Sequence, residues 1–123
     1  MAYLTDRKRA AGLGAAKTGT EHHWSMMVSS VALLLLVPLF VFTVGPVIGS
    51  NHGEMVAYFA KPFPAIVAAL TLTVGLMHFK NGAQTLIEDY VHGPAKKLTI
   101  IGVICLSYAA AGTALFSIAR IAL

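Results

Sequence analysis

The residues best suited to chemistry lie in one apolar stretch of the chain, where His78 precedes Asp89 and Tyr90. His78 stands about nine residues before the expected end of this stretch at residue 87. At the rise of an α-helix, it lies roughly 14 Å inside a membrane. A neutral imidazole buried there needs a partner on at least one ring nitrogen. Three partners are open: a hydroxyl or carbonyl on a neighbouring helix, a proton path, or a metal, above all haem iron.

The helix face around His78 carries small or polar residues. Positions three, four, seven and eleven apart share a face, and around His78 they are Thr71, Gly75, Gly82, Thr85 and Asp89. The two glycines, one turn on either side of His78, could leave room for a flat macrocycle against the backbone. They could equally let a second helix approach closely. Both alternatives require a partner at this face, but only haem ligation also requires the histidine.

Asp89 and Tyr90 close the same stretch. A tyrosine at a membrane interface is an expected anchor, and its hydroxyl can also donate a hydrogen bond to a carbonyl ligand. An acidic residue at a helix C-terminus opposes the helix dipole. Asp89 is therefore either well solvated or present for another reason, such as holding the Tyr90 hydroxyl.

Three apolar segments must position these residues. A bilayer core of about 30 Å requires about 20 apolar residues in a helix. Segments 25–48, 64–87 and 98–122 meet this length, and short connections separate them. The sequence therefore predicts an all-α membrane protein with three transmembrane helices. Because so short a chain has little core of its own, we expect it to pack against partner helices.

Composition excludes several other classes of protein. Of the 123 residues, 57% are hydrophobic and 11% are charged, and the mean hydropathy is +0.75. Soluble domains carry roughly 25% charged residues, and disordered chains have low hydrophobicity. A basic tail beside apolar spans is typical of a topology signal, so we expect no nucleic-acid partner. The single cysteine excludes an internal disulfide framework.

The distribution of Lys and Arg predicts the orientation of the chain. Four of these residues precede the first span, and Lys96 and Lys97 lie between the second and third. The opposite side carries Lys61 and Arg120. By the positive-inside rule, residues 1–24 form a cytoplasmic N-terminal arm, or a matrix one in an organelle. Residues 25–123 form the transmembrane part, with the C-terminus on the other side.

These residues resemble a known family. His78, Gly82, Asp89 and Tyr90 form the pattern H-x3-G-x6-D-Y at the end of a second span. This pattern is similar to that of the hydrophobic membrane anchor of succinate dehydrogenase, the D subunit of respiratory complex II. The segment Gly19-Thr20-Glu21-His22-His23-Trp24 before the first span also looks like the pre-helix segment of that family.

The resemblance implies a function and a set of partners. Such an anchor pairs with a cytochrome b-type C subunit of three helices, and one haem b lies between them with one axial histidine from each. His78 occupies the anchor's ligand position. The pair holds a flavoprotein subunit and an iron–sulfur subunit on the inner membrane, bacterial or mitochondrial. Electrons from succinate then reach ubiquinone, which Tyr90 contacts by a hydrogen bond and Asp89 supports.

The sequence departs from the family at one point. Many relatives carry a Gln-Arg pair where Met26 and Met27 stand here. If that arginine normally helps a haem propionate or the quinone region, another residue must replace it. The candidates in this chain are His22, His23 and Lys17, and a partner arginine is a further possibility.

Two alternatives remain beside the anchor hypothesis. In one, the chain is a haem-free structural or assembly subunit of another membrane complex, and His78 only forms a hydrogen bond between helices. In the other, His78 and Asp89 relay protons in a transporter, although the paired or broken helices typical of transporters are not visible in the sequence. The chain carries no flavin or cluster motif, so it is not a catalyst alone.

Overall fold

The computed structural model describes residues 3–15 and 19–123, and the regular structure in these ranges is helical. Three helices are long and apolar enough to cross a membrane: α2 (Glu21–Val44), α4 (Pro62–Tyr90) and α5 (Pro94–Ala122). The prediction of an all-α membrane protein with three transmembrane helices is confirmed.

The long helices do not begin and end where the apolar segments do. Helix α4 extends beyond 64–87 at both ends, and α5 begins before residue 98. Prolines open both helices, at positions where a missing N–H costs little. Helix α2 begins before residue 25, runs through Pro38 and ends at Val44, and a 3-10 turn, η1 (Gly45–Val47), follows it. Hydropathy marks the hydrocarbon core, whereas backbone hydrogen bonds continue into the interface.

Two short helices were not predicted. Helix α1 (Asp6–Ala11) lies in the N-terminal arm, and the Thr5 side chain caps it by accepting a hydrogen bond from the Lys8 N–H. Helix α3 (His52–Phe59) lies in the connection that we expected to be a loop. It is capped by Asn51, whose Oδ1 accepts a hydrogen bond from the Glu54 N–H at 2.9 Å. These caps satisfy N–H groups that have no partner in the first turn of a helix.

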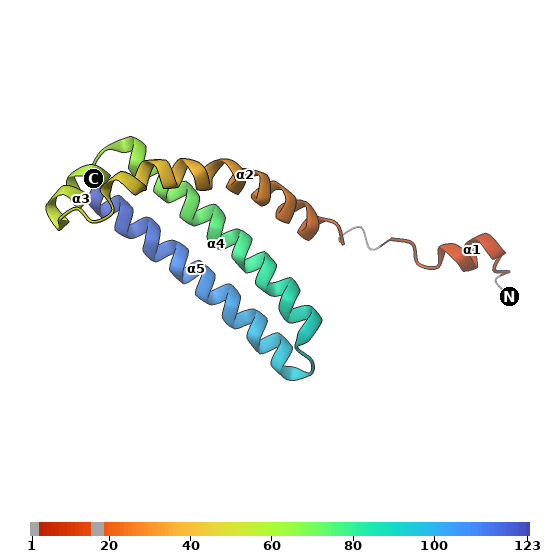
Figure 1. The fold of residues 1–123 in the computed structure, drawn as a ribbon. Helices are drawn as coiled ribbons and strands as arrows, with labels where there is room; N and C mark the ends of the chain where they lie inside the picture. The colour runs from red at the N-terminus through yellow and green to blue at the C-terminus, as the bar shows by residue number, and fades with distance from the viewer. Residues whose placement is uncertain (1–2, 16–18) are drawn as a thin grey trace.

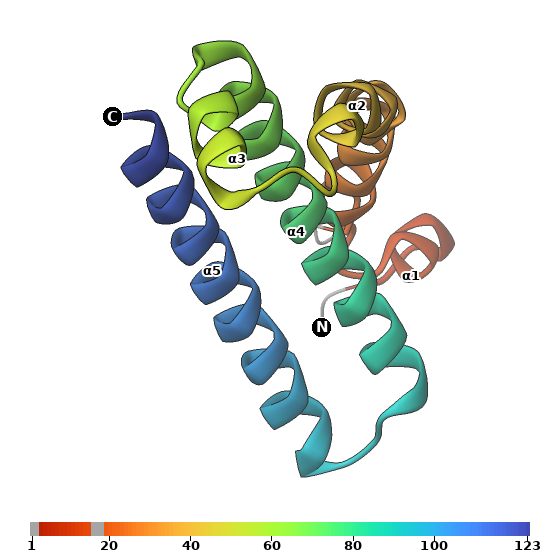
Figure 2. The same ribbon diagram turned by 60° about the vertical axis from the view of Figure 1, so that its left-hand side comes forward.

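Helix α4 is the centre of the bundle. It packs against α2 on one side and α5 on the other, whereas α2 and α5 have no close backbone approach to each other. Figures 1 and 2 show this order, with α3 lying across one end near the C-terminal end of α5. The Tyr58 hydroxyl of α3 donates to the Thr43 carbonyl of α2 at 2.7 Å, which ties the short helix to the bundle. The candidate residues on α4 therefore lie on the one long helix that has both other long helices as neighbours.

The core of the chain is small. Its buried apolar residues are Ala65, Val67, Ala68, Ile87 and Ala111. Large apolar side chains on the three long helices are mostly exposed, for example Leu34 at 73% and Phe42 at 80%. Such surfaces require lipid or other helices around them.

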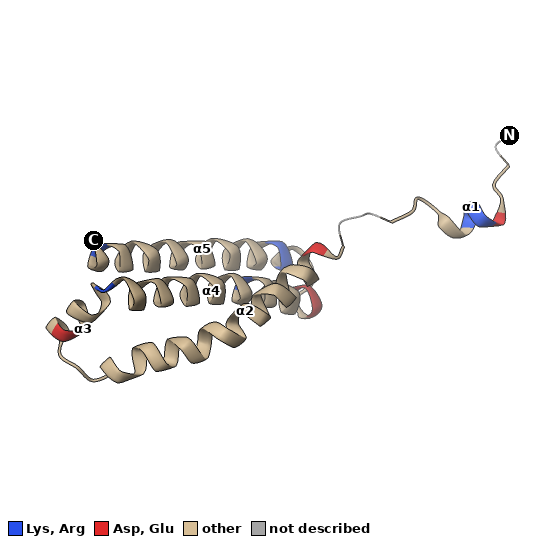
Figure 3. Cartoon of the chain, turned by 90° about the horizontal axis from the view of Figure 1, so that it is seen from above, with Lys and Arg blue, Asp and Glu red and all other residues tan. Residues whose placement is uncertain are grey.

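Apart from those on α1, the charged residues of the described ranges lie mainly at the two ends of the bundle (Figure 3). Lys80 differs, because it lies within α4. Its Nζ stands 5.5 Å from the centre of the Tyr108 ring on α5. A cation over an aromatic face is attracted by the ring, and the long lysine stem can lead toward the interface. This contact compensates part of the cost of a charge in the spanning segment.

The glycines of α4 lie against α2. A Cβ atom added at Gly75 would stand 4.0 Å from Leu33 Cδ2, and one added at Gly82 would stand 3.7 Å from Met26 Cε. These contacts agree with close helix packing, one of the two alternatives for this face. Room for a macrocycle at these glycines stays a prediction.

We expect Gly82→Leu to separate α2 from α4. Alanine adds one atom at an ordinary contact distance from Met26 Cε, whereas leucine adds three more carbons that must displace that side chain or the helix. Overpacking of this kind costs about 1–3 kcal/mol. After detergent-solubilised membranes are heated, less of the tagged Gly82→Leu chain should stay soluble than of Gly82→Ala. Equal solubility of the two variants would contradict the close packing.

Candidate functional site

A ladder of three polar side-chain pairs links α2 to α4. The pairs, in order along the helices, are His22 with Thr85, Ser25 with Asn81, and Ser29 with His78. The distances are 3.1 Å from His22 Nε2 to Thr85 Oγ1, 3.0 Å from Asn81 Nδ2 to Ser25 Oγ, and 2.8 Å from Ser29 Oγ to His78 Nδ1. Hydrogen bonds between membrane helices each contribute about 0.6 kcal/mol on average. We name these six residues the polar ladder.

His78 belongs to the last of the three pairs in the polar ladder. Its side chain is partly buried, and Nδ1 is the ring nitrogen that faces Ser29. The Ser29 hydroxyl also lies 2.8 Å from the Ser25 carbonyl and 3.0 Å from the Met26 carbonyl. Within the described ranges, no hydrogen bond reaches the other ring nitrogen, Nε2. That nitrogen is the one that could bind a group outside this chain.

The sequence analysis missed Ser25, Ser29 and Asn81, and it considered His22 only as a replacement for the missing arginine. The signal was present, because His22, Ser25 and Ser29 are three and four residues apart and therefore share one helix face. Asn81 follows His78 by three residues, and its side chain is buried at 7% exposure. A polar face on the first span opposite a polar face on the second would have predicted their contact.

Asp89 and Tyr90 lie in the last turn of α4, and both are exposed, Tyr90 at 79%. In the part of the chain that the structure describes, their side chains form no hydrogen bond with each other. The neighbouring Glu88 is the acid that is engaged: Gln84 Nε2 donates to its Oε1, and Lys96 Nζ donates to its carbonyl, both at 2.9 Å. Asp89 and Tyr90 are therefore free to contact another molecule.

His78 and Tyr90 lie at different depths of the same helix. They are twelve residues apart in α4, and the helix is continuous between them. This spacing corresponds to about 18 Å along the axis. A group held by His78 would lie within the membrane, whereas a group held by Tyr90 would lie near its edge.

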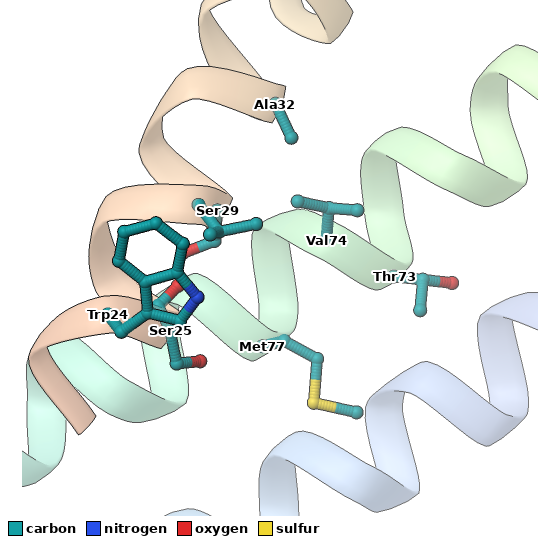
Figure 4. Close-up of a pocket in the computed structure, with 8 residues that line it drawn as sticks. Trp24, Ser25, Ser29, Ala32, Thr73, Val74 and Met77 are labelled. Carbon is teal, nitrogen blue, oxygen red and sulfur yellow. The ribbon is translucent and has the colours of Figure 1, made fainter. Parts of the chain in front are cut away.

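An open pocket of about 360 Å³ lies beside the ladder. Its walls come from α2 and α4: Trp24, Ser25, Val28, Ser29, Ala32, Thr73, Val74 and Met77. Figure 4 shows Ser25 and Ser29 on the α2 side and Met77 on the α4 side. Because its lining is mostly apolar, it suits an apolar chain or a helix side chain rather than a charged ligand.

The candidates for the missing arginine fall in different places. His22 is in the ladder, held by Thr85 of α4. His23 is exposed on α2. Lys17 lies outside the described residues.

The described residues do not form a metal site with all of its ligands from this chain. The described residues contain no group of three or more His, Cys, Asp or Glu side chains that could hold a metal ion. His78 contributes one free nitrogen, which suits an axial position on a group whose other ligands come from elsewhere. The donor set therefore fits a haem shared with a second chain and does not fit a metal held by this chain alone.

Comparisons with known proteins identify the family. The family model described as "Succinate dehydrogenase/Fumarate reductase transmembrane subunit" matches residues 1–114. The succinate dehydrogenase hydrophobic membrane anchor subunit of Paracoccus denitrificans is 44% identical over 123 residues, which cover all of this chain and 95% of the relative.

More distant relatives bear similar names. The hydrophobic membrane anchor subunit of Rickettsia conorii is 30% identical over 100 residues, covering 80% of this chain and 79% of the relative. The membrane anchor subunit of Reclinomonas americana is 26% identical over 88 residues, covering 69% and 73%. No solved structure shows significant similarity to this chain. With its three apolar helices, this chain is a multi-pass inner-membrane protein that belongs to the family of succinate dehydrogenase/fumarate reductase transmembrane subunits.

Proposed function

We propose that this chain anchors succinate dehydrogenase, supplies His78 as an axial ligand to haem b, and forms part of the ubiquinone site with Tyr90 and Asp89. The observation that carries the proposal is the position of His78. It is partly buried in an apolar helix, with Nδ1 held by Ser29 and Nε2 free. An ionisable side chain inside a membrane is a functional residue by default.

The proposed partners are those that the family resemblance implies. The second axial ligand then comes from a cytochrome b-type C subunit with helices of its own. The exposed apolar faces of α2 and α5 provide surface for that subunit and for lipid. Flavoprotein and iron–sulfur subunits, which oxidise succinate, dock at the end of the bundle where the chain passes from Tyr90 at the end of α4 to Pro94 at the start of α5. By the positive-inside rule, Lys96 and Lys97 favour the cytoplasmic or matrix side for this end and for the N-terminal arm.

His78 and its neighbours prepare the haem position. When bound, haem supplies a one-electron carrier within the membrane. Nε2 of His78 offers the lone pair, and the ladder holds the imidazole against α2.

Tyr90 and Asp89 act at the membrane edge. The Tyr90 hydroxyl donates a hydrogen bond to a carbonyl oxygen of ubiquinone and thereby orients the ring. Reduction of the quinone consumes two electrons and two protons, and protons are most easily supplied near water. Asp89, next to Tyr90 at the aqueous edge, relays protons from the aqueous side toward that carbonyl. Tyr90 and Asp89 therefore favour proton uptake from the side where α4 ends.

The second candidate function is a haem-free structural subunit of a membrane complex. The 2.8 Å contact between Ser29 and His78 favours it, because a hydrogen bond between helices is a sufficient reason for a buried histidine. In that case Nε2 of His78 is available for a hydrogen bond to a neighbouring subunit instead of iron.

Deleting this chain tests the anchor role. We expect succinate oxidation with a soluble dye to persist, now in the soluble fraction, because the catalytic subunits remain intact. Succinate-dependent reduction of ubiquinone in membranes should be lost, and the wild-type chain should restore it. Retained quinone reduction in membranes without this chain would contradict the proposal.

We expect Asp89→Asn to slow quinone reduction several-fold, because an amide cannot deliver a proton. Glu88→Gln is the matched control, since Glu88 is already engaged with Gln84. The measurement is the rate of succinate-dependent ubiquinone reduction, compared with dye reduction in the same membranes. Equal rates in the two variants would show that Asp89 has no special part.

A further inference from the structure

We infer that Ser29 is the positioning residue of the haem site: its hydroxyl oxygen accepts a hydrogen bond from the Nδ1–H of His78, which leaves the Nε2 lone pair for iron. This inference rests on the proposed function and adds a residue on α2 to it. The site then depends on two helices of this chain rather than on α4 alone.

The hydrogen bonds of Ser29 determine the direction of its contact with His78. A serine hydroxyl has one proton to donate and two lone pairs that accept. The Ser25 and Met26 carbonyls, 2.8 and 3.0 Å from Ser29 Oγ, can only accept. If the serine proton goes to these carbonyls, a serine lone pair faces His78 Nδ1 at 2.8 Å. Nδ1 must then carry the imidazole proton, and Nε2 is the basic nitrogen.

The opposite arrangement, in which Ser29 donates to His78 Nδ1, forms fewer hydrogen bonds. If Ser29 donated to Nδ1, both short carbonyl contacts would lose their proton. The imidazole proton would then sit on Nε2, where the described residues offer no acceptor. The first arrangement uses the serine proton and the Nδ1 proton and leaves one lone pair open.

The rest of the ladder fixes the distance between Ser29 and His78. One turn away, Asn81 donates to Ser25, and beyond it Thr85 contacts His22. These pairs prevent α2 from sliding or rotating on α4 without loss of a hydrogen bond. Ser30, next to Ser29 on the same helix, donates to the Met26 carbonyl at 2.8 Å and does not contact His78.

A hydrogen bond from the second nitrogen of a ligating histidine fixes its tautomer and raises its basicity. A more basic ligand stabilises the oxidised iron and lowers the midpoint potential. Loss of such a partner typically weakens metal affinity by about 10-fold or more. Ser29 should therefore lower the midpoint potential of the haem and slow its loss.

The test compares Ser29→Ala with Ser30→Ala in the intact complex. Both changes remove a serine hydroxyl that contacts the Met26 carbonyl, but Ser29→Ala alone removes the partner of His78. We expect Ser29→Ala to raise the midpoint potential of the b-type haem and to weaken haem retention roughly 10-fold. Ser30→Ala should match the wild type, and Ser29→Thr, which keeps the hydroxyl, should restore its values.

Equal potentials in Ser29→Ala and Ser30→Ala would overturn the inference. If Ser29→Ala does not assemble, Ser29→Cys replaces it, because cysteine is similar in size to serine and its sulfur is a much weaker acceptor. Ser29→Cys should also raise the midpoint potential of the haem. An unchanged potential in Ser29→Cys would likewise overturn the inference. The proposed function fails separately, if His78→Ala leaves the haem spectrum unchanged. If His78→Ala changes the haem spectrum but Ser29→Ala does not change the midpoint potential, only the role of Ser29 is overturned.

Discussion

Replacing His78 by alanine is expected to abolish or shift the b-type signal in the reduced-minus-oxidised absorbance spectrum of the complex. The substitution removes the nitrogen that we assign to the iron and leaves a methyl group on the α4 face that packs against α2. Among the described residues, no other histidine occupies the depth of His78, so this chain offers no replacement ligand. The spectrum of the purified complex, recorded beside that of the wild type, is the measurement.

The matched control for this change is His52→Ala. His52 is the first residue of α3, outside the membrane-spanning helices, and it is exposed. Its loss should leave the spectrum unchanged. A b-type signal that survives His78→Ala at its original wavelength and intensity would assign the haem to other residues.

Tyr90→Phe is expected to lower kcat/KM for ubiquinone by roughly 10-fold, because it deletes one hydrogen bond to a quinone carbonyl. The phenylalanine ring keeps the shape of the interfacial side chain, so assembly should be unaffected. Succinate oxidation with a soluble dye should not change, because that reaction does not use the quinone. Steady-state kinetics with varied ubiquinone measures the effect.

Tyr108→Phe provides the control for Tyr90. Tyr108 lies on α5 with its ring near Lys80, and phenylalanine preserves that contact. If both substitutions slow quinone reduction equally, the Tyr90 hydroxyl has no specific part. A Tyr90→Phe enzyme with wild-type kinetics would remove Tyr90 from the site.

The sequence was sufficient to predict the number and type of the long helices, because apolar length alone determines which segments cross a bilayer. It was not sufficient for their ends. Helix α4 continues through Asp89 and Tyr90 because backbone hydrogen bonding does not stop where hydropathy falls. Helix α3 was missed because its eight residues are too few for a clear pattern, although Asn51 is a favourable N-cap.

The candidate site was predicted in part. The polarity of the face around His78 was visible in the sequence, but two kinds of partner fitted it equally well. The choice between a macrocycle and a helix at Gly75 and Gly82 depends on how α2 crosses α4, which is a tertiary feature. Ser29 was missed for the same reason, because the role of a serine in an apolar helix depends on which residue of the neighbouring helix it contacts.

The polar ladder connects the sequence pattern of α2 to its packing against α4. Its residues on α2 are spaced at three and four positions, as one helix face requires, and they meet their partners on α4 in order. The register of the two helices is therefore encoded by side chains as well as by the glycine contacts. The resulting position of His78, rather than its presence in the sequence, is what supports the assignment of a ligand.

Purification through a tag on this chain, followed by spectroscopy and assay of the same sample, tests the proposed anchor function most directly. We expect succinate-oxidising flavoprotein and iron–sulfur subunits to co-purify with this chain and a second membrane subunit. The preparation should show a b-type haem signal and succinate-dependent reduction of ubiquinone. A purified assembly without succinate–quinone activity, or with that activity and no b-type haem, would contradict the proposed function.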